Sequence, residues 1–248
     1  MTTGTPMAID LRRPKSVGGV LGDALRCYAR YPVLFAVLAL GVVVPYTLIV
    51  LVANGAAPLG RQHGGATAVL ILLLLDLLIV TPLISALFIH ALVAVGEGRQ
   101  PRLLEVAALG VRVLPVVAAA EVVAGIATGV GFLLLIVPGV FLLIRWAVVA
   151  QAAAIERGDW LGALRRSGEL TAGNYLHVLA VLVIVGLIAL ALEQAGAAIV
   201  GTSANVPQVV VVIALLTITR SFVALTTAVL YFDLVARKSR LTPSAKLL

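Results

Sequence analysis

Five ionisable residues stand inside long apolar runs, where a charge can either do chemistry or lock helices together. Inserting a charge at the centre of a membrane-spanning helix costs about 2.5–3.5 kcal/mol, so such residues face one another or a polar cavity. From their depths along the runs, at about 1.5 Å per residue, we expect Arg145 to pair with Asp76 or Glu193. The same depths predict that Glu121 pairs with Arg220.

Two roles fit these five charges. In the first, they line a pathway for an ion, a proton or a lipid headgroup, and nearby hydroxyl groups assist: Thr81, Ser85, Thr217, Thr219 and Ser221. In the second, they form ion pairs that only fix the order of the helices. We favour the second role, because buried pairs often do no more than enforce an arrangement.

The motifs of soluble enzymes and of metal sites are absent from the sequence. His63, His90 and His177 are scattered without ligand spacing, and the single cysteine, Cys27, cannot form an internal disulfide. No phosphate-binding glycine loop and no GxSxG elbow occurs. We therefore expect no catalytic residue, no metal and no cofactor. Cys27 is interpreted as a packing residue, and His90 and His177 as anchors near helix ends.

The composition indicates that lipid surrounds most of the chain. Apolar residues make up 62% of the 248 residues, charged residues only 12%, and the mean hydropathy is +1.15. A soluble domain carries about twice that share of charge. The net charge of +7 favours anionic lipid headgroups as partners rather than nucleic acid, because the basic residues flank apolar runs.

Six segments are long and apolar enough to cross a membrane, which takes about 20 residues each. The chain is therefore predicted to be an all-α polytopic membrane protein. A Pro-Gly breaker at Val137-Pro138-Gly139 predicts a tight turn between the third and fourth segments. The six predicted spans are Tyr31–Ala53, Ala66–Val95, Val111–Val137, Gly139–Ile155, Asn174–Val200 and Pro207–Ala236.

Lysine and arginine residues set the expected orientation. Fifteen of the 18 lie in the segments before the first span, between the second and third, between the fourth and fifth, and after the sixth; one, Arg61, lies in the opposite loops. Basic residues stay in the cytoplasm. We therefore expect a multi-pass protein of the cell membrane with both termini cytoplasmic. Asp233 falls near the cytoplasmic end of the last span, where we expect water to reach it.

Three cytoplasmic segments carry apolar residues on one helical face, as helices in a membrane interface do. They are Ser16–Arg30, Arg102–Leu109 and Asp159–Leu170, and Asp159 is the expected N-cap of the third. We therefore predict three hairpins, each preceded by a short amphipathic helix. Residues 1–15 are predicted to form a disordered tail, 16–236 a single membrane domain, and 237–248 a basic tail.

Proline and glycine predict where the helices bend and touch. Pro45 and Pro82 should kink the first two spans. Gly125 and Gly129 form a GxxxG step, which permits a close helix contact. We expect that contact to be internal, with contact between subunits as the alternative, and to shelter Glu121 from lipid.

One stretch of the chain resembles a known family. The membrane domain attached to some glycerophosphodiester phosphodiesterases, and its stand-alone bacterial relatives of unknown function, share its pattern over about a fifth of the chain. The matching segments are Leu135–Gly139, Arg145-Trp146, Glu156, Ala163–Ser167, Leu170-Thr171 and Gly173-Asn174.

The resemblance implies a six-helix membrane module in envelope or lipid processes. The phosphodiesterase domain is missing here, so hydrolase activity does not carry over. The matching Glu156, Arg165, Arg166 and Ser167 fall at the cytoplasmic interface. Glu156 either pairs with Arg165 or Arg166 and so docks the third amphipathic helix, or the two arginines hold a lipid phosphate.

Three functions remain open from the sequence. We favour a non-enzymatic module that binds lipid or a membrane-protein partner. The alternative is a small transporter that uses the buried charges, and the least favoured is an intramembrane enzyme acting on lipids.

Overall fold

The computed structural model describes residues 13–53, 65–156, 158–200 and 206–241, and within these ranges all regular secondary structure is helical. The elements are α1 (Val17–Arg30), α2 (Pro32–Ala53), α3 (Ala66–Leu75), the π-helix η1 (Asp76–Val80), α4 (Thr81–Gly96), α5 (Leu103–Leu134), α6 (Ile136–Arg145), α7 (Val149–Ile155), α8 (Trp160–Thr171), α9 (Tyr175–Val200) and α10 (Val206–Leu241).

Six stretches of these helices are long and apolar enough to cross a membrane, which confirms the predicted fold class. Many large apolar side chains are exposed on the surface of the molecule, as expected for a protein that is surrounded by lipid. The chain is therefore an all-α polytopic membrane protein. The loop expected to carry Arg61 and His63 lies outside the described residues, as do residues 1–12 and 242–248 of the expected tails.

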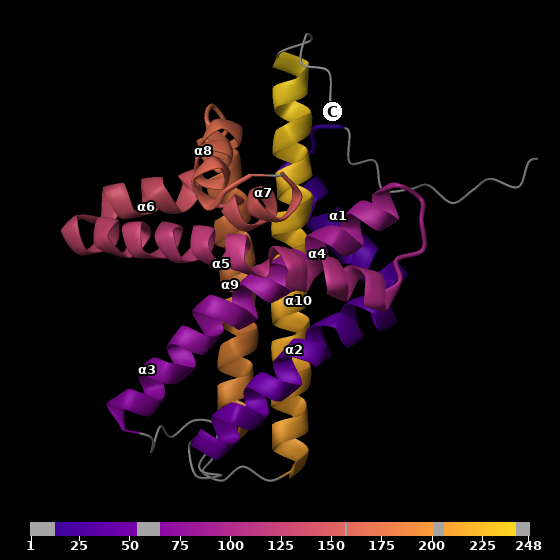
Figure 1. Ribbon diagram of the computed structural model, residues 1–248, viewed down its shortest axis with the longest axis vertical. Coiled ribbons are helices and arrows are strands. Elements are labelled where there is room, and N and C mark those ends of the chain that lie inside the picture. Colours follow the sequence, from indigo (N-terminus) through magenta and orange to yellow (C-terminus); the bar gives the residue numbers. More distant parts are fainter. Residues whose placement is uncertain (1–12, 54–64, 157, 201–205, 242–248) are drawn as a thin grey trace, which may run out of the picture.

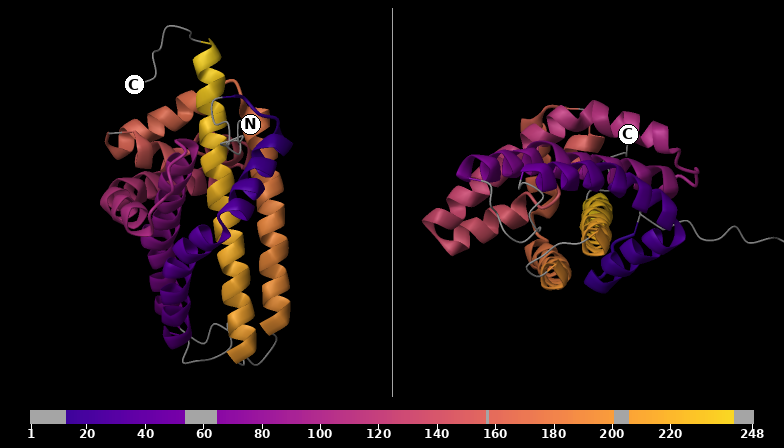
Figure 2. Two further views of the ribbon diagram at one scale, coloured as in Figure 1. Left: turned by 90° about the vertical axis from the view of Figure 1, so that its right-hand side faces the viewer. Right: turned by 90° about the horizontal axis from the view of Figure 1, so that it is seen from below.

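The helices splay rather than run parallel. Figures 1 and 2 show α9 and α10 side by side along the longest axis, and α5 and α6 side by side at a steep angle to them. The α2 and α3–α4 segments run obliquely between these two hairpins. We call the end that holds α1, α8 and the last turns of α10 the basic end, since Arg165, Arg166, Arg237 and Arg240 lie there.

The turn between α5 and α6 differs from the prediction. The chain breaks at Leu135, whose extended backbone (φ −162°, ψ 152°) separates the two helices, and Pro138-Gly139 lies in the first turn of α6. A proline fits there because the first-turn N–H groups have no helical partner. The break between the two helices therefore lies at Leu135, three residues before the Pro138 at which the turn was predicted.

Glycine sets how closely α5 and α6 approach. A Cβ on Gly139 would stand 2.4 Å from the ring of Phe132, and one on Gly131 would stand 3.0 Å from the Cα of Gly139. No atom lies within 4 Å of a Cβ added to Gly125 or Gly129. The predicted internal contact at the GxxxG step is therefore wrong, and the close contact lies at Gly131 and Gly139.

We predict that Gly139→Ala destabilises the hairpin by about 1–3 kcal/mol, since the added methyl group overpacks a contact that includes backbone. Thermal unfolding in detergent measures the effect. Gly129→Ala is the matched control, because it adds the same methyl group to open space on a helix. Equal melting temperatures for the two variants would contradict the close contact.

The amphipathic segments follow the prediction in two cases of three. Ser16 caps α1, where its Oγ accepts from the N–H of Gly19 at 3.2 Å, and Asp159 caps α8, where its Oδ1 accepts from the N–H of Gly162 at 2.8 Å. The segment Arg102–Leu109 is instead continuous with α5. Nothing breaks the helix there, and Gly110 packs where a Cβ would stand 2.7 Å from Leu87.

The fourth span is broken between α6 and α7 at residues 146–148. The carbonyl of Arg145 accepts from the hydroxyl of Ser167 at 3.1 Å and from the hydroxyl of Thr171 at 3.2 Å. Both hydroxyl donors belong to α8, so this amphipathic helix provides hydrogen bonds to the carbonyl of Arg145 at the break. A backbone group left without a partner in such a place would cost several kcal/mol.

Glu156 docks α8 against the bundle. Its Oε1 accepts from Nε of Arg166 at 2.7 Å and from the hydroxyl of Tyr231 on α10 at 2.9 Å. The predicted pairing of Glu156 is thus confirmed for Arg166. Arg165 pairs with Glu169 at 3.1 Å on the surface, where its own side chain is 83% exposed.

We predict that Arg166→Ala loosens α8, because it removes a charge-assisted hydrogen bond from a helix that also caps the α6–α7 break. Hydrogen exchange of the α8 amides should rise about tenfold, which corresponds to losing about 1.4 kcal/mol of local stability. Arg165→Ala is the control and should leave exchange unchanged. Similar exchange in both variants would rule out the docking role of Glu156.

At the basic end, a buried cluster of charged residues joins the start of α1 to the last turns of α10. Asp233 on α10 is 1% exposed. Its carboxylate accepts from Nε of Arg237 at 2.8 Å, lies 2.9 Å from Nε2 of His177, and accepts from the backbone N–H of Lys15. The side chain of Lys15 pairs in turn with Asp23 on α1. The prediction that Asp233 lies open to water is therefore wrong, since its partners enclose it.

Candidate functional site

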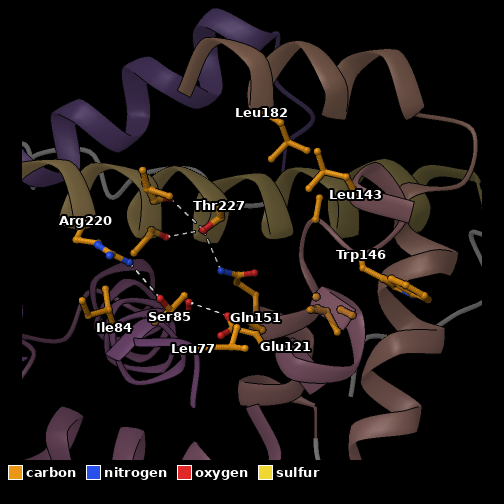
Figure 3. Close-up of a pocket in the computed structure, with 18 of the residues that line it drawn as sticks. Leu77, Ile84, Ser85, Glu121, Leu143, Trp146, Gln151, Leu182, Arg220 and Thr227 are labelled. Atoms are coloured by element: carbon orange, nitrogen blue, oxygen red, sulfur yellow. Dashed lines mark hydrogen bonds between the residues drawn. The ribbon is translucent and has the colours of Figure 1, made fainter. Parts of the chain in front are cut away.

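A crevice of about 560 Å³ lies where the splayed hairpins meet. Its lining comes from η1, α4, α5, α6, α7, α9 and α10, and the close-up in Figure 3 shows several of its polar side chains turned toward one space. The polar lining residues are Thr81, Ser85, Glu121, Thr128, Gln151, Glu193, Thr219, Arg220 and Thr227. The crevice therefore combines polar side chains with apolar walls.

Glu121 lies on the floor of the crevice. Its Oε1 accepts from the hydroxyl of Ser85 at 3.2 Å. Its Oε2 is buried and has no hydrogen-bond partner among the described residues. A buried carboxylate oxygen left in this way is costly, and a ligand with a hydrogen-bond donor would remove that cost.

Gln151 supplies a second free acceptor. The side chain is 2% exposed, and its Nε2 donates to the hydroxyl of Thr227 at 2.9 Å. This bond fixes the orientation of the amide, whose Oε1 is buried and lacks a partner within the described chain. The hydroxyl of Thr219, which also lines the crevice, is likewise buried and without a bond there.

An ion pair borders the same space. Nη2 of Arg220 lies 3.1 Å from Oδ1 of Asp76, and Nη1 donates to the hydroxyl of Thr81 at 3.1 Å. That hydroxyl donates in turn to Oδ2 of Asp76 at 3.3 Å. The predicted pairing of Arg220 with Glu121 is therefore wrong. The guanidinium of Arg220 pairs with Asp76 instead, because the second span places Asp76 at the same level in the bundle as Arg220.

The π-helix places Asp76 and Thr81 side by side. The N–H of Thr81 bonds to the carbonyl of Asp76, five residues earlier, and the hydroxyl of Thr81 bonds to the Asp76 carboxylate. Pro82 follows directly and has no N–H to continue the α-helical pattern. The kink predicted at Pro82 thus takes the form of a π turn, a feature that is frequent at functional sites.

Arg145 and Glu193 lie apart from each other. The guanidinium of Arg145 packs on Gly168 of α8, and the described residues include no ion pair between Arg145 and either Asp76 or Glu193. The predicted pairs of Arg145 are therefore wrong, because its side chain turns toward α8 and away from the crevice. Glu193 stands on α9 at the crevice wall with its side chain exposed.

Of the residues of the family-like pattern, Trp146 lines the crevice and the others lie outside it. Pro138 and Gly139 form the α5–α6 contact, and the carboxylate of Glu156 binds Arg166. Arg165 remains on the surface, and Ser167 is fully buried on the carbonyl of Arg145. In the structure these residues hold α6 and α8 in place, except for Arg165, whose side chain is exposed.

The remaining candidates have structural surroundings. Cys27 is fully buried, and burial together with the nearby charge of Asp23 raises the pKa of its thiol to about 12, so it stays protonated and unreactive. Nδ1 of His90 lies 2.7 Å from the carbonyl of Ala86 within the same helix. The interpretation of Cys27 as a packing residue fits these surroundings.

Comparisons with known protein families, with curated proteins and with solved structures give no match for this chain. The resemblance to the phosphodiesterase-linked membrane domain accordingly stays a prediction. Fold and site together define the chain as a polytopic α-helical membrane protein with a polar crevice between splayed hairpins.

We predict that Arg220→Leu destabilises the protein by about 3–5 kcal/mol, since it leaves the Asp76 carboxylate unpaired at the crevice. Abundance in membranes and the melting temperature in detergent should both fall. The double variant Asp76→Leu/Arg220→Leu should recover most of the loss, because it removes both charges. A single variant as stable as the parent protein would show that the pair does not hold η1 to α10.

Proposed function

We propose that this protein is a non-enzymatic membrane module that binds a lipid in the crevice. It lies in the cell membrane with the basic end in the cytoplasm, where the surface arginines meet anionic headgroups. The proposal extends the first of the functions inferred from the sequence. One observation carries it: buried acceptors without partners among the described residues line a crevice that has apolar walls.

The size and the lining of the crevice suit part of a lipid rather than a whole one. A volume of about 560 Å³ falls within the range of small-molecule sites. It accepts a headgroup and the first part of the chains, and Leu77, Leu143 and Leu182 form apolar walls beside it. The chains then continue into the surrounding bilayer, so that the ligand needs no enclosed cavity.

The resemblance to the phosphodiesterase-linked membrane domain supports the same reading, since it implies a role in envelope or lipid processes. Most of the positions that carry it hold the fold, and Trp146 alone among them lines the crevice. The resemblance therefore supports a role in envelope or lipid processes, while the crevice supports the binding of a lipid.

Filling the crevice tests the proposal. Gly125 lines it and has open space above it, so Gly125→Phe adds a ring to the crevice with little strain elsewhere. Gly129→Phe, one turn along the same open face and outside the crevice lining, is the matched control. After detergent washing, native mass spectrometry should find about tenfold less retained lipid on Gly125→Phe and normal retention on Gly129→Phe.

Equal lipid retention on the two variants would overturn the proposal. A second protein retained in place of lipid, and lost from Gly125→Phe, would move the assignment to the binding of a membrane-protein partner.

A second function, transfer of the bound lipid across the membrane, is favoured by one further observation. The crevice is bordered by the Asp76–Arg220 pair on a π turn, and polar groups inside a membrane mark substrate pathways. Vesicles containing the protein should then move a fluorescent phospholipid between leaflets. No acceleration over protein-free vesicles, with lipid retention intact, would leave the protein a binding module alone.

A further inference from the structure

We propose that the lipid headgroup held in the crevice carries an ammonium group with N–H donors, which binds between Glu121 and Gln151. This inference rests on the proposed function and specifies its ligand. It is argued from the charge balance of the crevice, from the kind of polar atom left free, and from the position of those atoms.

The charges of the crevice do not balance. Asp76 and Arg220 neutralise each other at 3.1 Å. Two further carboxylates line the space, those of Glu121 and Glu193, and no ion pair within the described chain involves either of them. Arg145, the other cation inside a span, turns toward Gly168 on α8. With both acids ionised, the crevice carries two uncompensated negative charges, which favours a cationic ligand.

Two of the free polar atoms can only accept, while the free hydroxyl of Thr219 can donate or accept. Oε2 of Glu121 and Oε1 of Gln151 are buried, lack hydrogen-bond partners within the described residues, and belong to side chains whose other polar atom is already bonded. A ligand that offers only acceptors, such as a bare phosphate, would face these oxygens without a bond. An ammonium group supplies both the charge and the N–H donors, and charge-assisted bonds of this kind are about twice as strong as neutral ones.

The geometry brings these atoms together from distant helices. Figure 3 shows Glu121 and Gln151 next to each other, with Ser85 bonded to Glu121 and Thr227 bonded to Gln151. Gln151 reaches this place because α7 begins anew after the break at 146–148. Glu193, on α9, also lines the crevice.

Two sources share this chemistry: the headgroup of an aminophospholipid and a free long-chain amine. Both carry a primary ammonium on an apolar tail. They differ in the phosphate, which only the phospholipid brings.

A tryptophan reporter tests the proposal in the whole protein. Trp146 lines the crevice, and the chain has one other tryptophan, Trp160 on α8. Trp160→Phe therefore leaves Trp146 as the one tryptophan of the chain. This variant is reconstituted into vesicles of phosphatidylcholine, and a brominated lipid, which quenches a neighbouring indole, is titrated in. The brominated probes are phosphatidylethanolamine, its N,N-dimethyl form, phosphatidylcholine and phosphatidylglycerol.

We expect half-maximal quenching by phosphatidylethanolamine at a mole fraction about tenfold lower than by phosphatidylcholine or phosphatidylglycerol. The N,N-dimethyl form, with one N–H donor left, should fall between. Glu121→Gln should remove the preference, because it keeps the size of the side chain and abolishes its charge. Glu105→Gln, which makes the same change at the exposed start of α5, should keep it.

The outcomes separate this inference from the proposed function. Quenching by phosphatidylglycerol equal to or stronger than that by phosphatidylethanolamine, abolished by Gly125→Phe, would overturn the ammonium inference and leave lipid binding intact. Quenching that Gly125→Phe does not reduce for any probe would overturn both. Displacement of brominated phosphatidylethanolamine by dodecylamine identifies the free amine as a second source, and its failure assigns the site to the phospholipid.

Discussion

A backbone group released from its helix inside a membrane must find another partner, and this requirement governs the whole structure. The helices open at two described places within the six spans, at the η1 turn and between α6 and α7. At η1 the N–H of Thr81 bonds to a carbonyl five residues back, and at the second break the hydroxyls of Ser167 and Thr171 bond to the carbonyl of Arg145. Each opening is thus stabilised by its neighbours, and each directs polar side chains into the crevice.

The shape of the crevice follows from where the helices touch. Gly131 and Gly139 bring α5 and α6 into close contact, and Gly110 brings α5 against α4. Gly125 and Gly129, further along α5, make no such contact and face open space. The α5–α6 hairpin and the α9–α10 hairpin therefore diverge, and the space between them is where Glu121, Gln151 and Glu193 gather.

The sequence predicted the all-α membrane fold because the length and the hydropathy of a segment are local properties. Six spans, two capped amphipathic helices and the Glu156–Arg166 pair all follow from residues close in the chain. The partners of Arg220 and Arg145 were not predicted correctly, because the depth of a residue along a helix does not determine the direction in which its side chain points. Gln151 was overlooked, although an amide inside an apolar run is a signal that could have drawn attention to it.

The cluster at Asp233 has a consequence for how the protein is made. The backbone of Lys15 binds a carboxylate 218 residues further along the chain. During synthesis α1 leaves the ribosome long before α10, so its final docking partner does not yet exist. The contact between the start of α1 and Asp233 can therefore form only after the last span has been made, so it is among the last contacts of the fold to close.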